Sequence, residues 1–311
     1  TADAREIDMV EQEVTIQSGD ASLSGTLCTP DAMGRFPAVL MVHGSGPLDR
    51  NENTKGQALN IFNAIACALA EHGIASLRYD KRGCGKSSGN YLSAGHSHLV
   101  QDALQCLDLA GSDPVCEEQL FVLVHSEGCI IAPQLSQYRP AVAGLVLLCP
   151  FIENLESMLK KQAAQIEEEV ESIRGIAGFY YRTVFRIIGK PRETDDDVVR
   201  FALSRQPAKW MREILALDAD AIYSANRTPM LLIAGNKDLQ CDPQDIFRIA
   251  ETTQGPSETL LVEGMTHLLR IDKNPATIMG AARQSREPLA NVVIEKTAHW
   301  INAASGAGHQ L

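Results

Sequence analysis

The most informative stretch of this chain is Phe121-Val-Leu-Val-His-Ser-Glu-Gly-Cys129. An apolar strand pattern runs directly into Ser126, and a glycine and a helical pattern follow the serine. Such a turn would raise a serine hydroxyl at the carboxyl end of the strand. The helix that begins there would point backbone N–H groups toward an anion formed beside the serine. The stretch therefore predicts a nucleophilic serine in a strand-to-helix turn.

One residue of this stretch departs from the usual G-x-S-x-G pattern. Val124 stands where the first glycine is expected. That glycine makes room for close packing around the turn, so a valine requires the neighbouring strand and helix to leave space. The alternative interpretation is an ordinary turn in which Ser126 caps the following helix. Residues elsewhere in the chain, which could supply a base and an acid, distinguish the nucleophile from the helix cap.

Strand and helix patterns alternate on both sides of this stretch. The strands are continuous apolar runs, which is typical of a parallel sheet covered by helices on both faces. Polar and apolar residues alternate on either side of Gly19-Asp20, which predicts a hairpin that adds an antiparallel edge. We expect core strands at 36–42, 74–79, 120–124, 143–149, 230–234 and 258–262, and helices near 61–69 and at 98–110, 127–137, 243–252 and 288–303.

The alternation stops between residues 151 and 227. Helical patterns at 155–173, 176–188 and 195–203 fill this segment, with no convincing buried strand. We therefore expect an α/β fold with a mostly parallel, doubly wound sheet, an antiparallel N-terminal edge and a helical insertion. The core domain would consist of residues 1–150 and 229–311, and residues 151–228 would form a helical cap.

A serine hydroxyl needs a positioned base to become a nucleophile, and the base needs a carboxylate to fix its tautomer. In folds of this kind the chain order is serine, acid, base. His267 follows the last strand in a glycine-bearing loop, and Asp238 follows the strand before it. Asp242 precedes a proline and is typical of a helix N-cap, and His299 falls inside the last helix. We expect Ser126, Asp238 and His267 to form a catalytic triad; the nearby Asp245 is a further rival for the acid.

A glycine-rich loop, His43-Gly-Ser-Gly-Pro47, directly follows the first core strand. The glycines would let the backbone approach a bound carbonyl group. We expect the N–H groups of Ser45 and Glu127 to form an oxyanion hole, although a plain glycine turn is the alternative. The residues expected to contact substrate are Gly44, Gly46 and His125.

A second loop, Tyr79-Asp-Lys-Arg-Gly-Cys-Gly-Lys-Ser-Ser-Gly89, mixes charge and glycine. A phosphate-binding loop needs G-x-x-x-x-G-K-[ST], and Asp80 stands where its first glycine should be. The loop also does not open a helix directly. We therefore expect a structural role, in which Asp80 and Arg82 brace the loop.

Charge excludes two classes of partner. The 311 residues carry a formal net charge of -11, and the sequence pI is near 5.2. Such a chain repels nucleic acid and anionic membrane surfaces, so we expect a small-molecule substrate, no nucleic acid and no membrane. The longest apolar runs, 38–42 and 141–149, are far shorter than the roughly 18 residues of a membrane span. The oligomeric state stays open, with a homodimer among the options.

The eight cysteines include no C-x-x-C pair. The zinc and redox templates are therefore not met, and the cysteines in apolar stretches are typical of small core residues. This pattern favours a reducing compartment, and we expect a cytoplasmic protein. Because the chain begins with Thr1 and not with Met, a secreted or periplasmic location stays open.

The loops 43–52 and 79–87 resemble those of α/β-hydrolases of the bacterial esterase, dienelactone-hydrolase-like and serine aminopeptidase-like group. The resemblance covers residues 14–128 and 230–267 in order, and the insertion resembles the cap of such enzymes. It implies a Ser–Asp–His triad that cleaves a carboxylic ester without a metal or organic cofactor. Thioester or amide cleavage, including aminopeptidase activity, is the alternative. A C–C hydrolase or lyase, or a non-catalytic binding module on this fold, is a further one.

The predicted cap carries two notable groups of side chains. Its aromatic residues could line an acyl pocket or pack the cap helices together. The acidic run 167–171 could select a cationic substrate or form a solvated helix face. The aromatic residues are Phe179, Tyr180, Tyr181, Phe185, Phe201 and Trp210.

Overall fold

The computed structural model of the chain describes residues 9–31, 34–154, 156–158, 160–162, 194–201, 204–277 and 280–306. Its main feature is a sheet in the order β1-β2-β4-β3-β5-β6-β9-β10. β1 and β2 pair antiparallel, β2 joins β4 antiparallel, and every other pairing is parallel. The predicted α/β fold with an antiparallel N-terminal edge is confirmed. The strands are β1 (Val10–Ser18), β2 (Ala21–Thr29), β3 (Phe36–Val42), β4 (Ala75–Tyr79), β5 (Cys116–His125), β6 (Val142–Leu148), β9 (Met230–Gly235) and β10 (Ser257–Val262).

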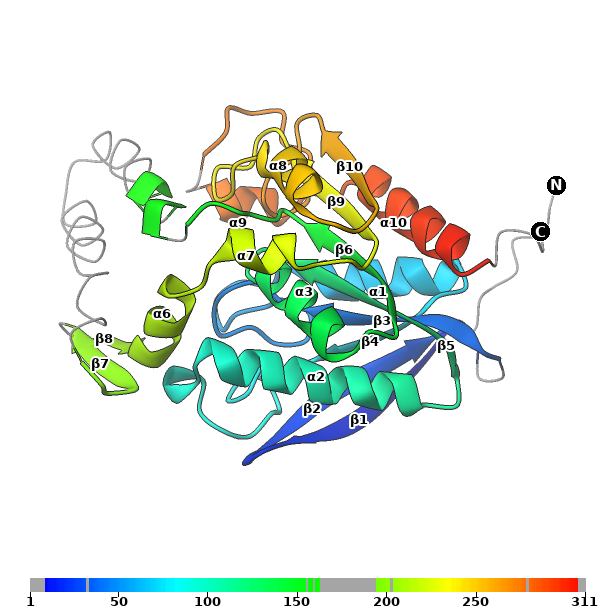
Figure 1. Cartoon of the computed structure of the whole chain (residues 1–311), viewed down its shortest axis with the longest axis horizontal. Coiled ribbons are helices and arrows are strands. Elements are labelled where there is room, and N and C mark those ends of the chain that lie inside the picture. Colours follow the sequence, from blue (N-terminus) through cyan, green and yellow to red (C-terminus); the bar gives the residue numbers. More distant parts are fainter. Residues whose placement is uncertain are drawn as a thin grey trace.

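Helices cover both faces of the sheet (Figure 1). α1 (Ile61–Glu71) and α10 (Asn291–Ala304) contact one another on one face. α2 (His96–Ser112), α3 (Gly128–Tyr138), α7 (Ala219–Ser224) and α8 (Asp245–Thr252) lie on the other. A 3-10 turn, η1 (Tyr91–Ser93), precedes α2, and the short α9 (Ala281–Gln284) precedes α10.

The two faces have separate hydrophobic cores. Along β5, Val122 and Val124 belong to the core shared with α2 and α3. Phe121 and Leu123 belong to the core shared with α1 and α10. Successive side chains of a strand point to opposite faces, so a strand buried on both sides has to be apolar throughout. This explains the continuous apolar runs.

The segment between β6 and β9 differs from the prediction in one place. Residues 195–203, expected to be helical, contain β7 (Val198–Phe201), which pairs antiparallel with β8 (Ser204–Pro207). The β-branched Val198 and Val199 favour extended backbone, and the acidic residues before them only imitate a helix start. α6 (Ala208–Leu215) follows and contacts α2 (Figure 1).

Part of the predicted cap lies outside the described residues. This applies to residues 176–188, to most of 155–173, to the acidic run 167–171 and to the side chain of Phe201. It also applies to Phe179, Tyr180, Tyr181 and Phe185.

All eight cysteines are free thiols, and seven of them are buried. This agrees with their predicted place as small core residues. Among the described helices, none has the length and apolar character that crossing a bilayer requires.

Candidate active site

Ser126 occupies a strained position between β5 and α3. Its φ angle is 52°, in the left-handed region. A non-glycine residue in this region costs about 1–2 kcal/mol, and such strain is concentrated at functional sites. The Ser126 N–H donates to the Leu148 carbonyl at 3.0 Å, and the Ser126 carbonyl accepts from the Cys129 N–H at 2.9 Å. The turn is therefore the sharp strand-to-helix connection that the sequence predicted.

Val124 fits because glycines stand at two close contacts of this turn, Gly128 beside Val124 and Gly44 beside Ser126. It is fully buried and pairs with Val42 of β3 and Leu147 of β6. A Cβ atom on Gly128 would lie 2.6 Å from the Val42 carbonyl oxygen and 3.1 Å from the Val124 Cβ. A Cβ atom on Gly44 would lie 3.2 Å from the Ser126 Cβ. The space that a glycine at position 124 would give is supplied by Gly128 and Gly44.

Asp238 and His267 meet at the carboxyl edge of the sheet. Asp238 follows β9 and His267 follows β10, and these strands are neighbours. The His267 Nδ1 lies 2.8 Å from the Asp238 Oδ2, and both side chains are buried. The Asp238 Oδ1 accepts from the N–H groups of Gln240 at 2.8 Å and Cys241 at 3.0 Å. The carboxylate is thus held in one orientation toward the imidazole.

The electrostatics of Asp238 favour its ionised form. Burial alone would raise the pKa of this carboxyl group. The charge and hydrogen bond of His267, with the N–H groups of Cys241 and Gln240, outweigh burial and lower the pKa. An ionised Asp238 accepts the His267 Nδ1 proton, which leaves Nε2 as the basic nitrogen.

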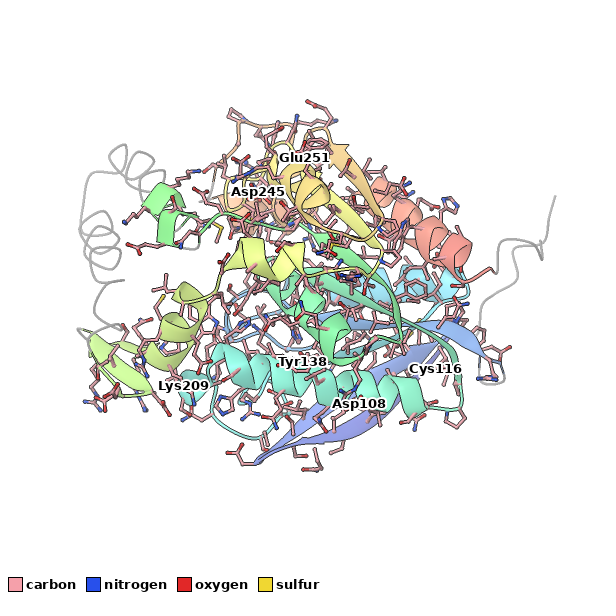
Figure 2. The ribbon with its side chains drawn as sticks, in the orientation of Figure 1. Asp108, Cys116, Tyr138, Lys209, Asp245 and Glu251 are labelled. Atoms are coloured by element: carbon pink, nitrogen blue, oxygen red, sulfur yellow. The ribbon has the colours of Figure 1, made fainter. Side chains whose placement is uncertain are left out.

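The rival residues have other partners. Asp242 is exposed and accepts from the Gln244 N–H at 3.0 Å, as expected of a turn before a helix. Asp245 begins α8 (Figure 2), where its carboxylate accepts from the Ile152 N–H at 3.0 Å and pairs with Arg248 at 2.7 Å. His299 lies on α10 beside His72.

A cavity of about 320 Å³ brings most of the predicted residues together. Ser126, His267, Ser45 and Glu127 all line it, and so do Gly44 and His125. Gly46 is not among the described residues that line it. The volume is at the lower end of the range for small-molecule sites, about 300–1,000 Å³. Its apolar walls include Leu48, Leu59, Phe151, Met158, Trp210, Ile214 and Leu268.

Two backbone donors face no protein acceptor. In the described part of the chain, neither the Ser45 N–H nor the Glu127 N–H donates to another protein group. The Gly44 N–H, in contrast, donates to the Glu52 Oε1 at 2.8 Å. Ser45 and Glu127 are therefore the free donors beside Ser126, as an oxyanion hole requires.

Asp80 and Arg82 brace the loop after β4, as predicted. Asp80 accepts from the Arg50 side chain at 3.2 and 2.9 Å and from the Lys86 N–H at 2.9 Å. Arg82 donates to both carboxylate oxygens of Asp102, at 2.8 and 2.6 Å. The sequence did not show what the loop holds: the Lys81 Nζ donates to the Gly44 carbonyl at 2.5 Å.

Two buried carboxylates of the site also escaped the sequence analysis. Glu127 pairs with Lys81 at 3.5 Å and accepts from the Trp210 indole N–H. Glu52 lies 3.0 Å from the Nδ1 of His125. The sequence shows these residues as charged groups in loops, but it does not show which of them pair. The partners Glu127 and Lys81, like Glu52 and His125, lie far apart in the chain.

Within the part of the chain that the structure describes, groups of three potential metal ligands occur only at this site. In the described residues, the groups that could hold an ion are His125, Cys149 and His267, and Asp238, Cys241 and His267. Both groups contain His267, whose Nδ1 is already engaged by Asp238. The arrangement fits a Ser–Asp–His triad better than a metal centre.

A family model described as serine aminopeptidase, S33, matches residues 55–274 of this chain. The chain therefore belongs to this family of α/β-hydrolases, and the predicted class of enzyme, a serine hydrolase, is confirmed. The matched residues contain β4, β5, β6, β9 and β10, and with them the turn at Ser126.

Individual relatives agree with this class. Esterase EstD of Thermotoga maritima is 26% identical over 293 residues, which cover 94% of this chain and 67% of that protein. The structure resembles Est1E of Butyrivibrio proteoclasticus with bound ferulic acid, at a TM-score of 0.63 and 16% identity, covering 94% of this chain and 99% of the other. It also resembles the Pyrococcus furiosus esterase Pf2001, at a TM-score of 0.63 and 14% identity, covering 97% and 92%.

Proposed function

We propose that this protein is a serine hydrolase that cleaves a carboxylic ester of a small molecule through an acyl-enzyme intermediate. Ser126 is the nucleophile, His267 the general base and acid, and Asp238 the residue that orients His267. The observation that carries the proposal is the buried Asp238–His267 pair, 2.8 Å apart, whose histidine lines the same cavity as the strained Ser126. The name of the relative EstD supports an ester substrate.

The reaction follows from these positions. His267 Nε2 takes the proton of the Ser126 hydroxyl, and Ser126 Oγ attacks the carbonyl carbon of the ester. The N–H groups of Ser45 and Glu127 stabilise the oxyanion of the tetrahedral intermediate. The C–O bond to the alcohol breaks, and the alcohol leaves with the proton from His267. Water, deprotonated by His267, then attacks the acyl carbon and releases the acid.

The cavity favours an ester over an amine-bearing peptide substrate. An ammonium group would need a free carboxylate, and the described wall contains two carboxylates, Glu52 and Glu127. Each already lies beside a buried basic side chain, His125 at 3.0 Å and Lys81 at 3.5 Å. The remaining wall is mainly apolar, which suits an uncharged acyl group. Thioester and amide cleavage by the same triad stay as the alternatives.

The segment 151–228 acts as a cap in this proposal. Met158 and Gln162 of this segment line the cavity, together with Trp210 and Ile214 of α6. In this proposal these side chains restrict the size of the acyl group.

Labelling with a fluorophosphonate tests the nucleophile. We expect one adduct by intact mass on the wild type, none on Ser126→Ala, and one on the control Ser112→Ala, whose serine is exposed on α2. A panel of p-nitrophenyl esters, thioesters and aminoacyl amides should show highest kcat/KM for esters. A folded wild type that takes no label would refute the proposal, and a preference for aminoacyl amides would replace the ester by a peptide substrate.

A cytoplasmic location is a further part of the proposal. The eight free thiols support a reducing compartment. Thiol titration of the unfolded protein, isolated under alkylating conditions from its own cells, should find eight reactive thiols. Fewer would indicate disulfides and an oxidising compartment.

A further inference from the structure

A second histidine–carboxylate pair lies in contact with the histidine of the proposed triad. Glu52 is 1% exposed and His125 is 5% exposed. The His125 Nδ1 lies 3.0 Å from the Glu52 Oε2, and the His125 Nε2 lies 2.9 Å from the backbone carbonyl oxygen of His267. The ring centroids of His125 and His267 are 4.9 Å apart. His125 therefore connects Glu52 to the residue proposed as the general base.

The partners of His125 define its protonation state. A carboxylate and a backbone carbonyl are both hydrogen-bond acceptors, so both ring nitrogens have to donate. A ring with two N–H donors is an imidazolium cation. Burial lowers the pKa of His125, but the charge and hydrogen bond of Glu52 and the carbonyl of His267 raise it further than burial lowers it. Burial raises the pKa of Glu52, and His125 and the Gly44 N–H lower it overall.

Glu52 also reaches the loop of the proposed oxyanion hole. Its Oε1 accepts from the Gly44 N–H at 2.8 Å, and Gly44 directly precedes Ser45. Glu52 has a φ angle of 63°, a left-handed conformation that a glutamate adopts at a cost of about 1–2 kcal/mol. This strained backbone places the carboxylate between Gly44 and His125.

We propose that Glu52 and His125 form a buried ion pair that positions the three parts of the reaction centre relative to one another. His125 directly precedes Ser126 and holds the backbone of His267, while Glu52 holds the Gly44 amide. Nucleophile, base loop and oxyanion loop are thus joined through one pair of side chains. Neither residue touches the reacting atoms in this inference, which rests on the proposed function: both are positioning residues.

Two substitutions of Glu52 distinguish the effect of its hydrogen bonds from the effect of its charge. Glu52→Gln can keep every hydrogen bond, because its amide oxygen accepts from the Gly44 N–H and its NH₂ donates to Nδ1 of a neutral His125. That tautomer still donates Nε2–H to the His267 carbonyl. Glu52→Ala removes the hydrogen bond to the Gly44 N–H and the partner of His125 Nδ1. Since displacing reacting groups by about 1 Å can cost 10²-fold in rate, we expect kcat of Glu52→Ala to fall by about 10–100-fold with little change in KM.

A second variant isolates the base loop without leaving a buried carboxylate unpaired. The side-chain amide of His125→Asn replaces Nδ1 and can donate to Glu52, but it is too short to reach the His267 carbonyl. We expect this variant to fold and to show a lower kcat and slower fluorophosphonate labelling than the wild type. It therefore keeps the inference testable even if Glu52→Ala does not fold.

The experiment combines kinetics and NMR on the full chain. We would measure kcat and KM for p-nitrophenyl acetate and the labelling rate for the wild type, Glu52→Ala, Glu52→Gln, His125→Asn and the control Glu71→Ala, an exposed carboxylate on α1. ¹⁵N spectra of the imidazoles should show His125 protonated on both nitrogens in the wild type and on one in Glu52→Gln. Glu52→Gln should retain most of the activity that Glu52→Ala loses.

Several outcomes would overturn the inference. They are wild-type kcat and labelling in folded Glu52→Ala or His125→Asn, equal losses in Glu52→Gln and Glu52→Ala, or a singly protonated His125 in the wild type. An unlabelled wild type would instead refute the proposed function. The two failures are therefore distinguishable.

Discussion

The indole N–H of Trp210 donates to the carboxylate of Glu127, the residue that directly follows Ser126. Trp210 lies on α6, so this bond connects the segment between β6 and β9 to the nucleophile turn. Glu213, on the same helix, accepts from the Ser97 N–H at the start of α2 at 2.7 Å. Two side chains of α6 thus fix one wall of the cavity to the core.

We predict that Trp210→Phe weakens substrate binding. Phenylalanine keeps most of the apolar wall but leaves a buried carboxylate with one hydrogen bond fewer, at a cost of about 1.5–3 kcal/mol. KM for p-nitrophenyl esters should rise, because the wall is no longer fixed. Trp300→Phe is the matched control, since Trp300 packs on Phe121 on the opposite face of the sheet. Equal KM values for the two variants would contradict this prediction.

Asp238→Asn should leave the protein folded and nearly inactive. The asparagine NH₂ group can donate to the His267 Nδ1 and so favours the wrong tautomer, in which the nitrogen facing Ser126 carries the proton. The loss in a comparable triad is about 10⁴-fold in kcat, and we expect a loss of this order in steady-state ester hydrolysis. Asp242→Asn, four residues away and exposed, should retain wild-type kcat. A similar loss in both would mean that Asp238 is not the orienting acid.

The pH dependence of stability follows from the buried carboxylates. The pKa values of Asp238 and Glu52 are lowered in the folded state from ordinary values of 3.8 and 4.5. Groups of this kind stabilise the fold above their unfolded pKa, and the contribution is lost as pH falls through the folded pKa. His125 has the opposite sign: its raised pKa stabilises the fold below pH 6.5 and loses this contribution as pH rises through the folded value.

Urea unfolding at a series of pH values checks these signs. In the wild type the Glu52–His125 pair should lose its contribution only below about pH 4.5, the ordinary pKa of a glutamate. Glu52→Gln holds a neutral His125 in the fold, so it should lose stability already as pH falls below about 6.5, where the unfolded chain protonates this histidine. Glu71→Gln should follow the wild-type curve, because Glu71 is exposed on α1. Parallel curves for the wild type and Glu52→Gln between about pH 4.5 and 6.5 would show that Glu52 and His125 are not an ion pair in the folded protein.

Much of the fold was predictable because the signals are local. Apolar runs mark strands buried on both faces, and the chain order of Ser126, Asp238 and His267 predicted residues that meet at one sheet edge. Pairing between distant residues had no such signal. His125 was predicted to contact substrate, and it does line the cavity. The sequence did not show that both its ring nitrogens also have protein partners, Glu52 and the His267 carbonyl, 73 and 142 positions away. The helix prediction for residues 195–203 was wrong because the acidic residues at their start resemble a helix N-terminus, while the valines that follow favour a strand.

The last prediction concerns the glycines that accommodate Val124. Gly128→Ala would place a Cβ atom 2.6 Å from a backbone carbonyl oxygen of β3. Because β3 is a central strand of the sheet, the turn that carries Ser126 would have to move instead. Small-to-large changes in a packed core typically cost about 1–3 kcal/mol, and here the displacement falls on Ser126. We expect a lower free energy of unfolding and a strongly reduced labelling rate.

Gly56→Ala is the control, because nothing lies within 4 Å of its Cβ position. Val124→Gly tests the same packing from the other side. It restores the usual elbow glycine, yet it should destabilise the protein by about 2–3 kcal/mol through the lost buried side chain and the added backbone entropy, without raising kcat. A more active Val124→Gly would mean that the valine distorts the turn; an unchanged or lower kcat with lower stability would mean that Gly128 and Gly44 already give the elbow the room it needs.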